Sequence, residues 1–153
     1  MTKPHPDVLR YGAPFVIGRA VVQALQAAEG LQGAVLCDNP VTAADLSTGD
    51  RVLLVEDQAD KPRGDQPGQR ARRSYGFALG VISRTDSARQ DAHADYRLAK
   101  RTVLECLPLL AQMGIEIEGG GMVEGDVRYR IENIDVGGAL VQGLFTLAYR
   151  DPA

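Results

Sequence analysis

The longest regular pattern of apolar positions in this chain predicts a helix from Ser87 to about Met113. Apolar and small residues recur there at steps of three or four, which places them on one face of a helix. The sequence at its start, from Ser87 to Gln90, fits a capping box. Pro108 should kink this helix or end its regular part near Leu104. The face consists of Ala88, Ala92, Tyr96, Ala99, Val103, Cys106, Leu110 and Met113.

A second, shorter helix is predicted from about Pro14 to Glu29, because Ile17, Val21 and Leu25 fall on one face. A proline suits the first turn of a helix, and Gly30 is well placed to end it. The preceding residues, 1–13, are rich in proline and are expected to form an extended arm. The organisation predicted is therefore an N-terminal arm (1–13), a single domain (14–150) and a short C-terminal tail (151–153).

Strand patterns flank the long helix on both sides. The predicted strands are 34–37, 51–56, 75–84, 115–118, 126–134 and 139–150, with turns expected at Gly119–Gly121 and Gly137–Gly138. They predict an α+β fold, with an antiparallel sheet of four to six strands and two helices packed on one face. The expected core is Ile17, Val21, Leu25, Leu53, Val55, Phe77, Leu79, Val81, Val103, Leu107, Leu110, Ile131, Phe145 and Leu147.

A long basic loop joins two strands of a predicted hairpin, over residues 57–74. Its cations are Lys61, Arg63, Arg70, Arg72 and Arg73. Long loops of this kind are usually functional or disordered. One interpretation is a solvated hairpin tip. The functional interpretation is contact with a neighbouring subunit or with nucleic-acid phosphates. Base stacking is not favoured, because the first aromatic residues, Tyr75 and Phe77, are assigned to the core.

Composition narrows the function classes. The chain has 153 residues, 44% hydrophobic and 24% charged, with a formal charge of −3, so no global excess of positive charge indicates nucleic acid. No run of 18 apolar residues predicts a membrane span, and the N-terminus lacks the apolar core of a signal peptide. These patterns predict a cytoplasmic origin.

Candidate catalytic and metal chemistry is weak. Cys37 and Cys106 lack metal or redox spacing, and neither His5 nor His93 has a Cys or His at ligand spacing, so no metal or cofactor is expected. The glycine clusters join strand to strand, whereas a phosphate loop joins strand to helix. Glutamates at 116 and 118 alternate with isoleucines and should be solvated. The chain is therefore not expected to be an enzyme.

The element order and the closing sequence Ala-Leu-Val-Gln-Gly-Leu-Phe-Thr-Leu-Ala-Tyr-Arg, residues 139–150, carry a family resemblance. From Pro14 to Arg150 the chain resembles the tail-terminator and tail-completion proteins of long-tailed bacteriophages. Those small α+β proteins end in an apolar strand with a polar-aromatic-arginine finish. The basic loop is interpreted as an elaboration, and the proline-rich arm has no counterpart in the family pattern.

The resemblance implies a virion protein, assembled in the host cytoplasm. Such a protein forms a ring, commonly a hexamer, that caps the tail tube and joins it to the neck or connector protein. Genome DNA passes through the lumen without sequence-specific binding. The hairpin Arg51–Arg84 is long enough to reach a neighbour or line the lumen, so its tip is expected to make subunit or tube contacts.

Three alternatives stay open. The chain could be a head-completion or connector protein, which is built from similar small α+β subunits. It could be a nucleic-acid-binding module that uses the basic hairpin, although a pI of about 5.4 disfavours DNA binding as the main role. It could also be a small enzyme whose active site forms only between subunits. The assembly protein is the preferred hypothesis.

Overall fold

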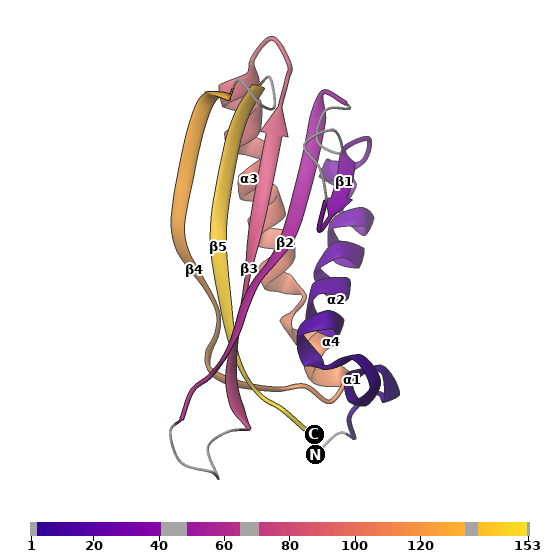
Figure 1. The fold of residues 1–153 in the computed structure, drawn as a ribbon. Helices are drawn as coiled ribbons and strands as arrows, with labels where there is room; N and C mark the ends of the chain where they lie inside the picture. The colour runs from indigo at the N-terminus through magenta and orange to yellow at the C-terminus, as the bar shows by residue number, and fades with distance from the viewer. Residues whose placement is uncertain (1–2, 41–48, 65–70, 134–137, 153) are drawn as a thin grey trace.

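The computed structural model describes residues 3–40, 49–64, 71–133 and 138–152. They form one strongly twisted sheet with helices against one face (Figure 1), which confirms the predicted α+β class. The elements are α1 (Pro6–Tyr11), α2 (Ala13–Ala27), a 3-10 turn η1 (Glu29–Leu31), β1 (Val35–Asp38), β2 (Arg51–Pro62), β3 (Arg72–Ser83), α3 (Ala88–Glu105), α4 (Leu107–Gln112), β4 (Glu116–Asn133) and β5 (Gly138–Arg150).

The sheet has five strands in the order β1-β2-β3-β5-β4 among the described residues. Three neighbouring pairs are antiparallel, but β1 and β2 are parallel, with Val35 opposite Val52. The sheet is therefore mixed rather than wholly antiparallel as expected. The sequence could not show this, because the apolar pattern of a strand is independent of the direction of its neighbour.

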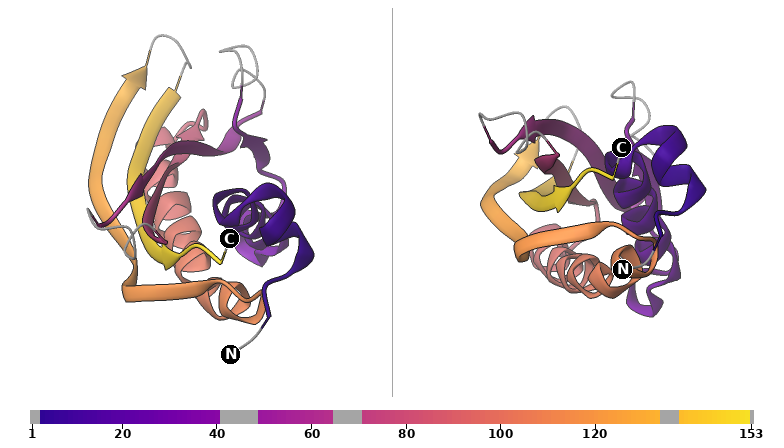
Figure 2. Two further views of the ribbon diagram at one scale, coloured as in Figure 1. Left: turned by 60° about the horizontal axis from the view of Figure 1, so that its bottom comes forward. Right: turned by 90° about the horizontal axis from the view of Figure 1, so that it is seen from below.

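The core lies between the sheet and the helical layer formed mainly by α2 and α3 (Figure 2). Alternate residues of β3 and β5 face the helices, and the rings of Phe77 and Phe145 stack there at a centroid distance of 5.5 Å. The predicted core residues are buried, except that Leu107 is only partly buried and the side chain of Ile131 lies outside the described part of the chain.

The long helix is interrupted near its predicted proline. Helix α3 ends at Glu105, and α4 begins at Leu107 with Pro108 in its first turn. Cys106 caps both helices. The predicted kink is thus confirmed, whereas the capping box is wrong, because the side chain of Ser87 makes no capping hydrogen bond.

The N-terminal arm is not wholly extended, which corrects the prediction for residues 1–13. Helix α1 has Pro6 in its first turn, an acidic Asp7 beside it, and a buried Val8. The backbone amide of His5 donates to the carbonyl of Met113, at 2.9 Å, and ties the segment to the end of α4. A proline and an acid both favour a helix N-terminus, and the buried valine supplies the packing.

Two strand predictions were too short. Strands β2 and β3 extend into the expected loop 57–74 from both sides, pairing as far as Pro62 and Arg73. The expected turn at Gly119–Gly121 is also wrong, because these glycines lie inside β4. Gly119 and Gly121 have φ of 65° and 80°, at a register shift between Ile117 and Met122, so they form an irregularity within the strand. The glycine turn expected at 137–138 lies largely outside the described residues, since Gly138 already starts β5.

The lower end of the β2–β3 hairpin extends past helices α1 and α4 (Figure 1). Each strand of the hairpin has 12 residues and spans roughly 40 Å at about 3.3 Å per residue, and β2 is exposed from Asp57 to Pro62. No helix in the described part of the chain is long and apolar enough to cross a membrane.

Candidate functional site

Two of the five predicted basic residues are free on the hairpin surface. Lys61 and Arg63 are exposed, one near the end of β2 and the other just after it, and no ion pair within the described residues engages them. The backbone amide of Arg63 donates to the carbonyl of Arg72, at 2.7 Å, so the strands stay paired to this point. Arg70 lies outside the described residues.

The other two arginines form ion pairs within the chain. Arg72 Nε donates to Glu118 Oε2 at 2.9 Å, and Arg73 Nε donates to Asp60 Oδ2 at 2.8 Å. Because successive side chains of a strand point to opposite faces, Arg72 lies on the sheet face away from the helices and Arg73 on the helix side. The structure therefore does not bring the predicted cations together as one patch.

A polar cluster, here called the hairpin-base cluster, lies where β2, β3 and β5 meet. Asp60 accepts a second hydrogen bond from the hydroxyl of Tyr149, at 2.9 Å. The hydroxyl of Tyr75 donates to Asp57, and the backbone amide of Asp57 donates to Asn39 Oδ1 at 2.7 Å. Burial, followed by the hydrogen bond to an aspartate, raises the pKa of both tyrosines above the ordinary value.

The hairpin-base cluster is structural in its chemistry. Its tyrosines stay protonated at neutral pH and act as hydrogen-bond donors to carboxylates, which leaves no activated nucleophile among them. The cluster links β2 to β5 across β3, and its Tyr75–Asp57 pair lies beside Gly18 of α2. Only Lys61 and Pro62 of β2 and Arg72 of β3 follow the Asp60–Arg73 pair toward the hairpin end, and Arg72 still pairs with Arg150 of β5, so the cluster fixes the ends of both strands against the sheet.

A basic groove between α3 and β4 was missed by the sequence analysis. Arg89, His93, Arg97 and Arg101 are exposed and recur at four-residue steps, which aligns them along one face of α3. Three hollows of about 240, 270 and 340 Å³ follow this row. The first two share His93 and Tyr129 and lie between α3 and β4. The third is lined by α3 residues alone and continues the row, since it shares Arg97 and Lys100 with the second. We call the three hollows together the α3–β4 groove.

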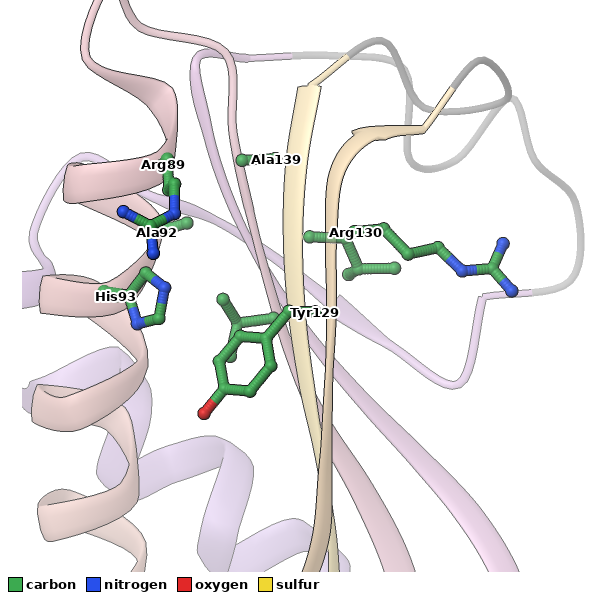
Figure 3. A pocket seen from close by; sticks show the side chains of 8 residues that line it. Arg89, Ala92, His93, Tyr129, Arg130 and Ala139 are labelled. Atoms are coloured by element: carbon green, nitrogen blue, oxygen red, sulfur yellow. The ribbon is translucent and has the colours of Figure 1, made fainter.

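The groove has an apolar floor at its upper end, formed by Ala92, Ala139 and Val141. Figure 3 shows His93 of α3 and Tyr129 of β4 across this end. Their rings stack at a centroid distance of 5.1 Å, and Tyr129 is 57% exposed. The four-residue arginine spacing was visible in the sequence, but nothing in it placed β4 beside α3.

The middle of the groove is held together by one acid. Glu124 of β4 accepts hydrogen bonds from the Tyr96 hydroxyl at 2.7 Å and from Lys100 Nζ at 2.9 Å. Burial alone would raise the pKa of Glu124, but these two hydrogen bonds and the charge of Lys100 outweigh it and lower that pKa. The Glu124 carboxylate therefore bonds to Tyr96 and Lys100 of α3, and it does not neutralise the arginines of the row.

The described residues show neither a cluster placed to bind a metal ion nor an activated Cys106 thiol. No group of three or more His, Cys, Asp or Glu side chains within them is placed to hold a metal ion. Burial raises the pKa of the Cys106 thiol to about 11, so it is not an activated nucleophile at neutral pH.

The chain thus belongs, by its fold, to the class of single-sheet α+β proteins, with a projecting hairpin and a basic groove at one sheet edge. No protein-family model matches it, and no curated protein matches it either.

Proposed function

We propose that this chain is a structural subunit that closes into a ring, and that the ring is a tail terminator of a long-tailed bacteriophage. In this role it caps the tail tube and joins it to the neck, with genome DNA passing through the lumen. The observation that carries the proposal is the β2–β3 hairpin, whose lower end extends past α1 and α4 and is fixed to β5 by Asp60 near the end of β2 (Figure 1).

A braced projecting arm suits assembly better than catalysis. Asp60 joins β2 to Arg73 of β3 and to Tyr149 of β5, so moving the end of β2 away from the sheet must break two hydrogen bonds to a charged group. Hydrogen bonds to charged groups contribute about 1.5–3 kcal/mol each. The arm therefore presents Lys61 and Arg63 in a defined position to a neighbouring subunit or to the tube.

The two sheet edges also suit a cyclic assembly. A ring needs two unlike surfaces on each subunit, one fitting the other head to tail. Strand β1 is 4 residues long and pairs with β2 only from Val52 to Val55, whereas β4 at the other edge is 18 residues long. The edges thus differ in length, shape and covering helix.

The nucleic-acid alternative loses support at the hairpin. Arg72 and Arg73 are neutralised by Glu118 and Asp60, which leaves Lys61 and Arg63 as the cations for phosphate among the described hairpin residues. Affinity driven by phosphate contacts falls steeply with salt, and its slope scales with the number of cations engaged. A head-completion role is the second assembly hypothesis. Binding to the tail tube distinguishes the two, because it is expected of the tail terminator.

The test is the mass of the purified chain by light scattering, with and without polymerised tail tubes, followed by negative-stain imaging. Rings with a central hole, seated on tube ends, are expected. The variant K61A/R63A should keep wild-type stability and lose tube capping. The matched control K3A/R10A removes two exposed cations from the N-terminal segment and should assemble normally.

Two outcomes count against the proposal. If K61A/R63A caps tubes as well as the wild type, the hairpin is not the contact. If the wild-type chain stays a monomer or a compact dimer in the presence of tubes, the chain does not form a terminator ring.

A further inference from the structure

Among the described residues, no acid forms an ion pair with the arginines of the α3–β4 groove. Arg89, Arg97 and Arg101 are exposed, and none forms an ion pair with another described residue. Two acids among the described residues line the groove. Glu124 is already engaged by Tyr96 and Lys100, and Glu105, at the third hollow, forms no ion pair with a described residue. A hollow lined by guanidinium groups that form no ion pair favours the binding of an acidic group.

An acidic surface of the same chain lies at the opposite edge of the sheet. Asp38 ends β1, and Glu56 and Asp57 follow the stretch of β2 that pairs with it. Asp38 and Asp57 lie on the helix face and Glu56 on the other face, so the three acids flank this edge on both sides. Asp38 and Asp57 lie close enough to the hydroxyl of Tyr75 for their charges to raise its pKa. No described cation pairs with these three acids. We call Asp38, Glu56 and Asp57 the acidic edge.

The two surfaces cannot meet within one subunit, because β3 and β5 separate β2 from β4 in the sheet. Between two subunits they can meet, since the basic surface of one faces outward at the β4 edge and the acidic surface of the next at the β1–β2 edge. We propose that the α3–β4 groove receives the acidic edge of a second copy of this chain. This inference rests on the proposed ring and names the faces that meet in it.

A head-to-tail contact of this kind leaves one groove and one acidic edge unused in every open chain of subunits. The assembly therefore grows until the last groove meets the first acidic edge, which gives a closed ring when the rotation permits. Complementary charge also fixes the order of the faces, because groove against groove or edge against edge places like charges together.

A single nucleic-acid strand is the other chemistry that could occupy the groove, given its arginines and the exposed ring of Tyr129. A second copy is favoured for two reasons. The complementary charge lies on the chain itself, and the formal charge of −3 opposes a polyanion at long range.

The test is a charge exchange between two full-length variants, both checked for folding by circular dichroism and thermal unfolding. The variant R97E/R101E reverses the charge of the groove, and D38K/E56K reverses the charge of the acidic edge. Each alone should fail to form rings, with or without tail tubes. An equimolar mixture should recover rings, because reversed groove then meets reversed edge and native groove meets native edge. The control K3E/R10E, which reverses two exposed cations elsewhere, should assemble normally.

The outcomes separate this inference from the ring proposal. Rings from R97E/R101E alone, or from D38K/E56K alone, overturn the inference and leave the ring standing. If the wild type forms no rings, amine-to-carboxylate crosslinking of R97K/R101K tests the contact by itself, and crosslinks between residue 97 or 101 and the acidic edge of another copy support it. Salt-sensitive binding of a labelled single-stranded oligonucleotide that R97E/R101E abolishes, with ring assembly unchanged, assigns the groove to nucleic acid and overturns the inference.

Discussion

Tyr96 of α3 lies over Gly143 of β5 so closely that a Cβ at position 143 would overlap the tyrosine hydroxyl. That hydroxyl donates to Glu124 Oε2 on the neighbouring strand β4, at 2.7 Å. The absence of a side chain on Gly143 therefore lets α3 pass over β5 and bond to the edge strand. The wall of the α3–β4 groove depends on this close approach.

Gly143→Ala should destabilise the fold by about 1–3 kcal/mol, the usual cost of forcing an extra methyl group into a packed site. The new Cβ would also meet the Phe145 ring, 3.3 Å away, so the added methyl group cannot shift toward that ring to relieve the overlap. In the double variant Gly143→Ala/Tyr96→Phe the loss should be smaller than the sum of the single losses. Relief stays partial, because the Tyr96 Cζ atom lies 3.0 Å from the added Cβ.

The measurement is urea denaturation of the four members of this cycle. Gly76→Ala on β3 is the matched control, because the nearest contact of its added Cβ is an ordinary 3.6 Å. Additive losses in the cycle would show that Tyr96 does not occupy the space above Gly143.

Arg51 at the start of β2 ties three elements together. Its guanidinium donates to both carboxylate oxygens of Asp95 on α3, each at 2.9 Å, and to the carbonyl of Gly30 in η1, at 2.9 Å. Arg51→Ala should cost about 2–3 kcal/mol, because it leaves a largely buried carboxylate unpaired. Arg51→Lys should recover only part of this, since an ammonium cannot make the paired contact.

The control for Arg51 is Arg19→Ala. Arg19 makes a single 2.8 Å bond to Asp7, and both side chains are 32% exposed, so the expected loss is about 0.2–1 kcal/mol. Equal losses for Arg51→Ala and Arg19→Ala would mean that the Asp95 contact does not hold β2, η1 and α3 together.

The helices and the core could be predicted largely from the sequence, because burial of one face imposes a period that the residues show directly. Phe77, Leu79 and Val81 alternate with small residues, and the break near Pro108 follows from its missing amide. The ends of β2 and β3 were missed for the same reason. From Asp57 to Pro62 the strand is exposed, so its pairing depends on backbone hydrogen bonds that leave no apolar period.

The candidate site was harder to predict than the fold. The cations at 72 and 73 are consecutive in sequence, yet they point to opposite sheet faces and meet Glu118 and Asp60, which are 46 and 13 residues away. The α3–β4 groove had a local signal in Arg97 and Arg101. Its other wall comes from a strand whose place at the sheet edge only the tertiary structure determines.

Alkaline solution should weaken the fold through its buried tyrosines. Burial and hydrogen bonds to acids raise the pKa of Tyr75, Tyr96 and Tyr149 above the ordinary 10.0. In the unfolded chain these hydroxyls ionise near pH 10, while the folded chain keeps its protons. Their contribution to stability is therefore present in full below pH 10 and is lost as the pH rises above it.

The measurement is the free energy of unfolding in urea from pH 8 to pH 11. Tyr149→Phe should lower stability at pH 8, because Asp60 loses a donor, and should flatten the fall above pH 10. Tyr129→Phe, which removes the hydroxyl of a ring that is 57% exposed, serves as the control. A fall of equal steepness in Tyr149→Phe would show that its hydroxyl titrates as it does in the unfolded chain.

Phe145 tests whether the closing strand belongs to the core or to an interface. Its side chain is fully buried, stacks on Phe77 and lies among the helix-facing residues of β5, so Phe145→Ala should cost about 3–5 kcal/mol. Thr146→Ala, one residue on, changes an exposed position on the other sheet face and should stay within about 0.5 kcal/mol. Both are measured by urea denaturation of the isolated chain. If Phe145→Ala proved nearly neutral there but prevented assembly, the last strand would pack against a partner rather than against α3.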